Sequence, residues 1–184
     1  MTAIITGVSE RFGIKPREAE RFVKFLIVGM TGFVVDFTIF NLLIGPIGVW
    51  VSPDHWLYNL LTGFGLSGDF VISLAPTLAA IVSFIMAVCN NFIWNRHWTY
   101  PDSRSKSRRK QFTMFLTVSL IGIMIRIPLI TVLNPIFKSI FKAIPLVAPY
   151  ANRLAANAAL AIAVLVVLFW NFFINRFWTY NDVE

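Results

Sequence analysis

The chain has 184 residues, 57% of them hydrophobic and only 14% charged, and its mean hydropathy is +0.71. Soluble domains carry about a quarter charged residues, so this apolar excess, which is gathered in blocks, excludes an ordinary soluble globular protein. The net charge of +7 would suggest a nucleic-acid partner in a soluble chain, but here the basic residues flank apolar blocks and suit a membrane surface. With one cysteine, Cys89, and two distant histidines, an intramolecular disulfide is excluded and a metal site has too few ligands.

Four apolar segments are long enough to cross a hydrocarbon core as helices, which takes about 20 residues each. They cover residues 22–44, 72–94, 112–133 and 154–174. Pro16, followed by Arg-Glu-Ala-Glu, predicts a helix start that leads directly into the first span. We therefore expect an all-α integral membrane protein that forms a single membrane domain over residues 1–184.

The segments between the spans are predicted to break the helices. Prolines are expected to end them, at Pro46, Pro53, Pro135 and Pro145. The spacing of apolar residues in 136–144 predicts a separate short amphipathic helix at the outer surface. His55 to Tyr58 are expected to anchor the other outer loop.

The distribution of lysine and arginine predicts the orientation in the membrane. Residues 1–24 carry five of these residues and 95–111 carry six, whereas 45–71 carry none and 134–153 carry three. Cytoplasmic loops carry the excess of positive charge. We therefore expect a multi-pass protein of the cytoplasmic membrane, with the N-terminus, the 95–111 loop and the C-terminus in the cytoplasm.

The sequence contains an internal repeat. Residues 91–102, NFIWNRHWTYPD, recur 80 residues later in 171–182 as NFFINRFWTYND, with eight identities in twelve positions. The beginnings of the repeats match at an offset of 90, pairing Phe22, Phe25, Leu26, Val28 and Gly32 with Phe112, Phe115, Leu116, Val118 and Gly122. Repeat 1 therefore covers about 20–102 and repeat 2 about 110–182, and the second outer connection is about ten residues shorter.

Each repeat is predicted to be a helical hairpin of two spans. Because an even number of spans restores the starting side, both hairpins should enter the membrane in the same orientation, as parallel repeats about an axis along the membrane normal. Small residues on the first and third spans are expected to let those two helices approach closely. They are Gly29, Gly32, Ser119 and Gly122.

The repeated ends of the second and fourth spans are the candidate binding site. Arg96 and Arg176 offer planar forks suited to bidentate phosphate binding. Asparagines four residues apart lie beside each fork: Asn91 and Asn95, and Asn171 and Asn175. These residues predict a site for a lipid phosphate headgroup, while the alternative is that the arginines anchor the helix ends and the asparagines bond between helices. The neighbouring aromatic residues fit an interfacial belt: Trp98, Tyr100, Trp178 and Tyr180.

Two charges are predicted near the bilayer centre, Asp36 in the first span and Arg126 at the matching point of the third. Either one alone costs about 2.5–3.5 kcal/mol at a helix centre on insertion scales. We expect them to neutralise each other as an intramembrane pair. The pair could be purely structural, or it could line a polar groove that a headgroup crosses.

The paired hairpins, the F-x-x-F-L-x-V-x-x-x-G opening at Phe22 and the two N-R-x-W-T-Y ends resemble the GtrA-like family of small membrane proteins. The resemblance covers roughly residues 20–182 and implies a role in moving polyprenyl-phosphate-linked sugars across the membrane for cell-surface polysaccharide assembly. The sequence departs from the family pattern at Arg126, because the second repeat is usually uncharged there.

The leading hypothesis is a translocase, or part of one, for a polyprenyl-phosphate-linked monosaccharide, without catalytic residues or cofactor. Four short helices enclose little volume, so a homo-oligomer in contact with membrane lipids is expected, and no nucleic-acid partner. One alternative is a non-catalytic membrane anchor for a glycosyltransferase. Another is a small multidrug-type exporter that uses Asp36.

Overall fold

The structure is a computed structural model that describes residues 15–182. Within this range it contains helices and no strands. Four helices are long and apolar enough to cross a membrane, which confirms the all-α fold with four transmembrane helices. They are α2 (Pro16–Trp50), α4 (Gly68–Trp94), α5 (Arg108–Lys142) and α6 (Ala151–Ile174). Arg11, one of the basic residues expected near the N-terminus, lies outside the described residues.

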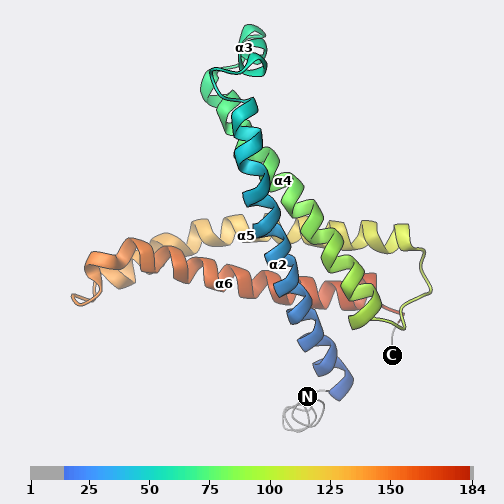
Figure 1. Cartoon of the computed structure of the whole chain (residues 1–184). Coiled ribbons are helices and arrows are strands. Elements are labelled where there is room, and N and C mark those ends of the chain that lie inside the picture. Colours follow the sequence, from blue (N-terminus) through green and yellow to red (C-terminus); the bar gives the residue numbers. More distant parts are fainter. Residues whose placement is uncertain (1–14, 183–184) are drawn as a thin grey trace. The chain divides into compact units, whose positions relative to one another are not determined.

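The chain divides into two compact units, Met1–Pro101 and Asp102–Glu184, and each contains one repeat. The first is the hairpin of α2 and α4, joined by α3 (Trp56–Gly63) and ending in η1 (Asn95–Thr99). The second is the hairpin of α5 and α6, joined by η2 (Ala148–Tyr150) and ending in η3 (Asn175–Thr179). Figure 1 shows both as pairs of antiparallel helices. The parallel arrangement of the two repeats in a membrane stays a prediction.

The first and third helices are longer than predicted. Pro46 lies inside α2, and Pro128 and Pro135 lie inside α5. The prediction of a separate amphipathic helix at 136–144 is therefore wrong, because residues 136–142 form the last turns of α5. A proline removes only one backbone hydrogen bond, and an apolar environment penalises the loss of all the others that a break would cause.

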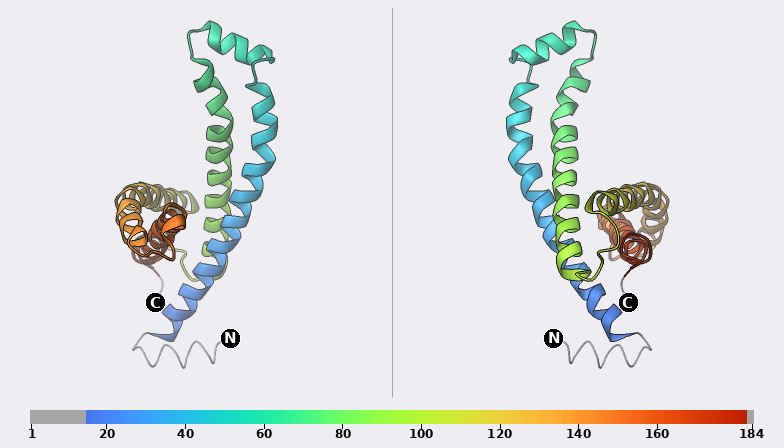
Figure 2. Two further views of the ribbon diagram at one scale, coloured as in Figure 1. Left: turned by 90° about the vertical axis from the view of Figure 1, so that its left-hand side faces the viewer. Right: turned by 90° about the vertical axis from the view of Figure 1, so that its right-hand side faces the viewer.

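Other predicted boundaries are correct. Pro16 is the first residue of α2, where its missing N–H leaves no bond unmade. The first repeat has the longer connection, and it contains α3, which lies across the end of the hairpin in Figure 2. The His55 ring caps this helix, since its Nδ1 accepts a hydrogen bond from the backbone N–H of Leu57 at 3.3 Å. Val71 and Ala75 of α4 form a small apolar core there, with Val51, Ile47, Tyr58, Leu61 and Leu74 around them.

Each hairpin packs internally through positions that are equivalent in the two repeats. The buried residues of α2 are Arg21, Phe25, Val28 and Gly32, and those of α5 are their repeat equivalents Gln111, Phe115, Val118 and Gly122. The facing helices bury a stripe of mostly small residues at every fourth position, comprising Val71, Ala75, Ala79, Ser83 and Ala87 in α4 and Ala151, Ala155, Ala159 and Ala163 in α6. Small side chains at this spacing let two helices approach closely. The stripe is visible in the sequence but was not among the predicted features.

Two of the predicted small residues, Gly32 and Gly122, make contacts within a hairpin. A Cβ at Gly32 would collide with the side-chain amide of Asn91 on α4. A Cβ at Gly122 would come within 3.1 Å of the Asn171 amide nitrogen and of Val167 on α6. Gly29 has open space around it in the structure. These two glycines therefore let the two helices of each repeat approach closely, and the approach of the first and third helices stays a prediction.

Candidate functional site

Each N-R-x-W-T-Y motif folds into a π-helical turn at the end of its helix. The backbone N–H of Tyr100 donates to the carbonyl of Asn95 at 2.8 Å, and Tyr180 donates to Asn175 at the same distance. These bonds span five residues instead of four, which widens the last turn. Such turns are rare and occur frequently at functional sites. Because a π turn forms at the motif in both repeats, the motif itself encodes the turn.

The π turns bury their polar residues. Asn95 and Thr99 in η1 and Asn175 and Thr179 in η3 are at most 2% exposed. In η3 the Thr179 hydroxyl donates to the Asn175 side-chain oxygen at 2.8 Å. In η1 the corresponding oxygens of Asn95 and Thr99 are buried without a hydrogen-bond partner among the described residues. These asparagines thus form the polar interior of the turns and do not present exposed amides.

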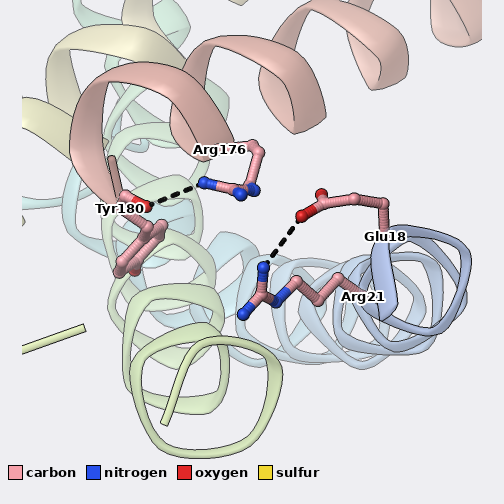
Figure 3. Close-up of polar contacts among 4 residues, drawn as sticks. All are labelled: Glu18, Arg21, Arg176 and Tyr180. Atoms are coloured by element: carbon pink, nitrogen blue, oxygen red, sulfur yellow. Dashed lines mark hydrogen bonds and ion pairs between the residues drawn. The ribbon is translucent and has the colours of Figure 1, made fainter. Parts of the chain in front are cut away.

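The two motif arginines differ in their surroundings. Arg96 is buried, with 6% of its surface exposed. Arg176 is half-buried, its guanidinium donates to the backbone carbonyl of Tyr180 at 3.4 Å, and it lies 5.7 Å from the Phe177 ring. Figure 3 shows the hydrogen bond from Arg176 to Tyr180. The two repeats therefore place an arginine at the same position of the turn, but Arg176 is more exposed to solvent than Arg96.

Two further cations gather at the turn of the first repeat. Arg21 donates to Glu18 at 2.8 Å, as Figure 3 shows, and its guanidinium lies 5.9 Å from the Tyr100 ring. Lys24 lies 5.8 Å from the Trp98 ring and pairs with Glu20 at 2.7 Å. In the sequence Arg21 and Lys24 indicate the topology, and only the packing of α2 against η1 brings them to the turn.

The second repeat lacks both of these cations. At the offset of 90 residues, Gln111 replaces Arg21 and Met114 replaces Lys24. The buried Gln111 amide instead donates to the Ser103 hydroxyl at 2.7 Å. The two additional cations of the first turn therefore have no repeat equivalent, and the second turn is contacted instead by Lys106 from the linker.

The remaining asparagines lie one turn further into the helices, against the glycines of the partner helix. Asn91 contacts Gly32, and Asn171 donates to the carbonyl of Val167 at 2.9 Å. Both are half-buried. They continue the four-residue stripe that runs along α4 and α6 into the π turns.

The aromatic residues of the motif separate into two kinds. Trp98 and Trp178 are exposed, at 37% and 44%, as an interfacial belt requires. Tyr100 and Tyr180 are fully buried, so they differ from the expected belt and belong to the core of the hairpin ends. A period of two between Trp and Tyr places them on different faces, because the turn is helical and not extended.

The segment between the repeats closes on the end of the second one. Asp182 accepts hydrogen bonds from the Ser103 hydroxyl and, at 2.7 Å, from the backbone N–H of Ser105. The Lys106 ammonium donates to the carbonyls of Trp178 at 2.8 Å and Thr179 at 3.2 Å. These are carbonyls that a helix end leaves without partners, and a cation suits them. We call this arrangement the linker clasp.

The pKa of Asp182 reflects the clasp. Burial raises it, but the hydrogen bonds from Ser103 and Ser105 outweigh burial and hold the pKa well below its ordinary value. A depressed folded-state pKa adds stability at pH values above the ordinary value of 3.8, and this stability is lost as the pH falls toward the folded-state pKa. Burial lowers the pKa of Lys106, which the charge of Asp182 partly opposes. The clasp is therefore intact throughout the neutral range.

Asp36 lies on α2 and Arg126 on α5, in different units. Asp36 is half-buried and Arg126 is exposed. Their pairing stays a prediction from the sequence.

The comparisons with known proteins cover both repeats. The family model described as GtrA/DPMS, transmembrane domain, matches residues 24–180, from the first turns of α2 through both π turns. A comparison with curated proteins gives no match.

Proposed function

This chain belongs to the GtrA/DPMS transmembrane-domain family, and on that premise we propose that it moves a polyprenyl-phosphate-linked monosaccharide across the cytoplasmic membrane for polysaccharide glycosylation. The observation that carries the proposal is the cluster of Arg21, Lys24 and Arg96 at the first π turn. An ionised phosphate is prohibitively costly in hydrocarbon, so a carrier must supply cations where the headgroup enters. The polyprenyl tail can stay in the lipid throughout.

In this proposal the first turn holds the phosphate. Glu18 and Glu20 pair with Arg21 and Lys24 when no ligand is present, and they keep the cations oriented toward the turn. A phosphate that displaces a carboxylate exchanges one charge-assisted bond for another, which keeps binding reversible. Reversibility is what a translocase needs, because a carrier must release its load on the other side.

We place both π turns, the linker clasp and the termini at the cytoplasmic face, because the basic residues concentrate there. The chain acts as a carrier without catalysis, as a homo-oligomer, with a membrane glycosyltransferase as a partner that supplies or consumes the lipid-linked sugar. Asp36 and Arg126 are polar groups that the headgroup meets further into the membrane.

Loosening the linker clasp should expose the linker to protease. Asp182→Ala removes both carboxylate acceptors, and we expect trypsin to cut after Arg104 or Lys106 up to about tenfold faster than in the unchanged protein, since hydrogen bonds to charged groups contribute about 1.5–3 kcal/mol and less where exposed. The measurement is digestion of inverted membrane vesicles at pH 8. Asp54→Ala, on the other hairpin, is the matched control.

Sealed right-side-out vesicles should protect the linker in every variant. Cleavage there would contradict the proposed sidedness, and equal cleavage rates for Asp182→Ala and the unchanged protein would contradict the clasp.

Replacing Arg96 by lysine tests the phosphate site. Lysine keeps the charge but loses the planar fork, so binding of a polyprenyl phosphate should weaken at least about tenfold, while insertion and helix content stay unchanged. Binding to the purified protein in lipid nanodiscs and flipping in reconstituted vesicles are the readouts. Arg153→Lys, at the start of α6 and exposed, is the matched control and should bind normally.

The second arginine should respond less. Arg176→Lys occupies the turn that lacks the two additional cations, so we expect a smaller loss of binding than for Arg96→Lys. Full binding and flipping in both lysine variants would reduce the motif to a membrane anchor and favour the role of a glycosyltransferase anchor.

A further inference from the structure

A cluster of neutral polar side chains lies inside the first hairpin, apart from the cations of the π turn. The Asn90 amide nitrogen donates to the Thr31 hydroxyl at 3.1 Å and to the Asn91 side-chain oxygen at 3.4 Å. The Thr31 hydroxyl in turn donates to the carbonyl of Val28 at 2.8 Å. Gly32 makes room for this cluster, because a Cβ there would collide with the Asn91 amide. Three polar side chains from two helices thus meet at one point.

This point lies within the hydrocarbon and is accessible. Thr31 follows the start of the apolar run at Phe25 by six residues, or about 9 Å of helix rise, in a half-bilayer of about 15 Å. Thr31 is exposed, and Asn90 and Asn91 are half-buried. Within residues 15–182 the side-chain oxygen of Asn90 and the amide nitrogen of Asn91 make no hydrogen bond. Open polar groups at membrane depth are costly, and such groups commonly serve function.

The second hairpin has different residues at the same position. The repeat equivalents of Thr31 and Asn90 are Ile121 and Trp170. The Trp170 indole N–H donates to the carbonyl of Val118 at 3.1 Å, and Asn171 donates to the carbonyl of Val167 at 2.9 Å. The donors of Trp170 and Asn171 are therefore bonded to backbone carbonyls of the second repeat, and the side-chain oxygen of Asn171 makes no hydrogen bond among the described residues. The two repeats share a fold, but at this depth only the first joins three polar side chains by hydrogen bonds within the described residues.

We infer that Thr31, Asn90 and Asn91 form a site for the hydroxyl groups of a neutral sugar, used by the headgroup after it leaves the π turn. The inference rests on the proposed function and assigns the sugar to the first hairpin. The cluster has amide and hydroxyl groups and no cation, which suits a polyol and not a phosphate. Asn90 precedes Arg96 by six residues, about 9 Å along the helix axis, so a phosphate at the arginine and a sugar at the cluster could be held by one helix.

The test compares a bare polyprenyl phosphate with the same lipid carrying a single glucose, galactose or mannose. The unchanged protein in nanodiscs should bind at least one of the glycosylated lipids about tenfold more tightly than the bare lipid, as two or three net hydrogen bonds allow. Asn90→Leu should abolish that preference while leaving the affinity for the bare lipid unchanged. Thr31→Val, a change of similar shape at an exposed position, should reduce the preference and serves as a second variant that keeps the fold.

Trp170→Phe is the matched control in the second hairpin, since it removes one donor at the equivalent position, and it should keep the full preference. The inference is overturned if the unchanged protein binds all lipids equally, or if Asn90→Leu and Thr31→Val both keep the preference. Those results leave phosphate binding and the proposed function intact. Failure to bind even the bare polyprenyl phosphate would instead overturn the proposed function, and with it this inference.

Discussion

Replacing Gly32 by leucine is expected to destabilise the protein by about 3 kcal/mol, the upper part of the usual range for overpacking. A Cβ alone at this position would collide with the Asn91 amide, and a leucine side chain would separate α2 from α4. The measurement is unfolding of the purified protein in mixed micelles as the SDS fraction is raised, followed by circular dichroism.

Gly29 provides the matched control for this substitution. It lies on the same helix, three residues earlier, and nothing lies within 4 Å of the Cβ that a side chain would add. Gly29→Leu should leave the unfolding transition unchanged or raise it slightly, since leucine favours helix and glycine does not. Equal destabilisation by the two variants would mean that the contact between α2 and α4 does not depend on Gly32.

Replacing Tyr180 by alanine should cost about 3–5 kcal/mol, the range measured for large buried aromatic residues. The side chain is fully buried beside the π turn, and its removal would leave a cavity between the helix ends. Phe177→Ala is the control, because Phe177 belongs to the same turn and is 67% exposed. That variant should change stability by less than about 1 kcal/mol.

The comparison of these two variants also separates the two roles proposed for the aromatic residues. If both residues belonged to an interfacial belt, truncating either one should destabilise the protein by similar amounts, and mostly in a bilayer. Truncating a core tyrosine should destabilise the protein in detergent micelles as well. The unfolding assay in micelles therefore contradicts the core assignment if Tyr180→Ala and Phe177→Ala behave alike.

The four spans, the helix start at Pro16 and the two-hairpin organisation could be read from the chain. Hydropathy over about 20 residues is a local property, and self-similarity needs no knowledge of contacts. The wrong predictions come from applying the rule that proline ends a helix within long apolar segments. Pro46 and Pro135 were predicted to end helices, but the surrounding hydrogen-bond ladder continues through them.

The binding role of the repeated motif stays a prediction. The motif points to Arg96 and Arg176 because an arginine beside asparagines at the end of a span suits phosphate binding. The same motif did not reveal that Asn95 and Tyr100 would be buried. Asn95 continues the four-residue stripe of α4. Tyr100 lies five residues further on, across the hydrogen bond of the π turn, and the four-residue spacing does not predict its burial.

Contacts between residues distant in the chain were beyond prediction from one sequence. The bond from Asn90 to Thr31 joins residues 59 positions apart, and that from Ser105 to Asp182 joins residues 77 apart. Composition and spacing determine that a helix forms and that it enters the membrane, because those depend on each segment's own transfer energy. Which polar groups remain open within it is determined by packing, because a hydrogen-bond partner on another helix is present only once the hairpin has closed.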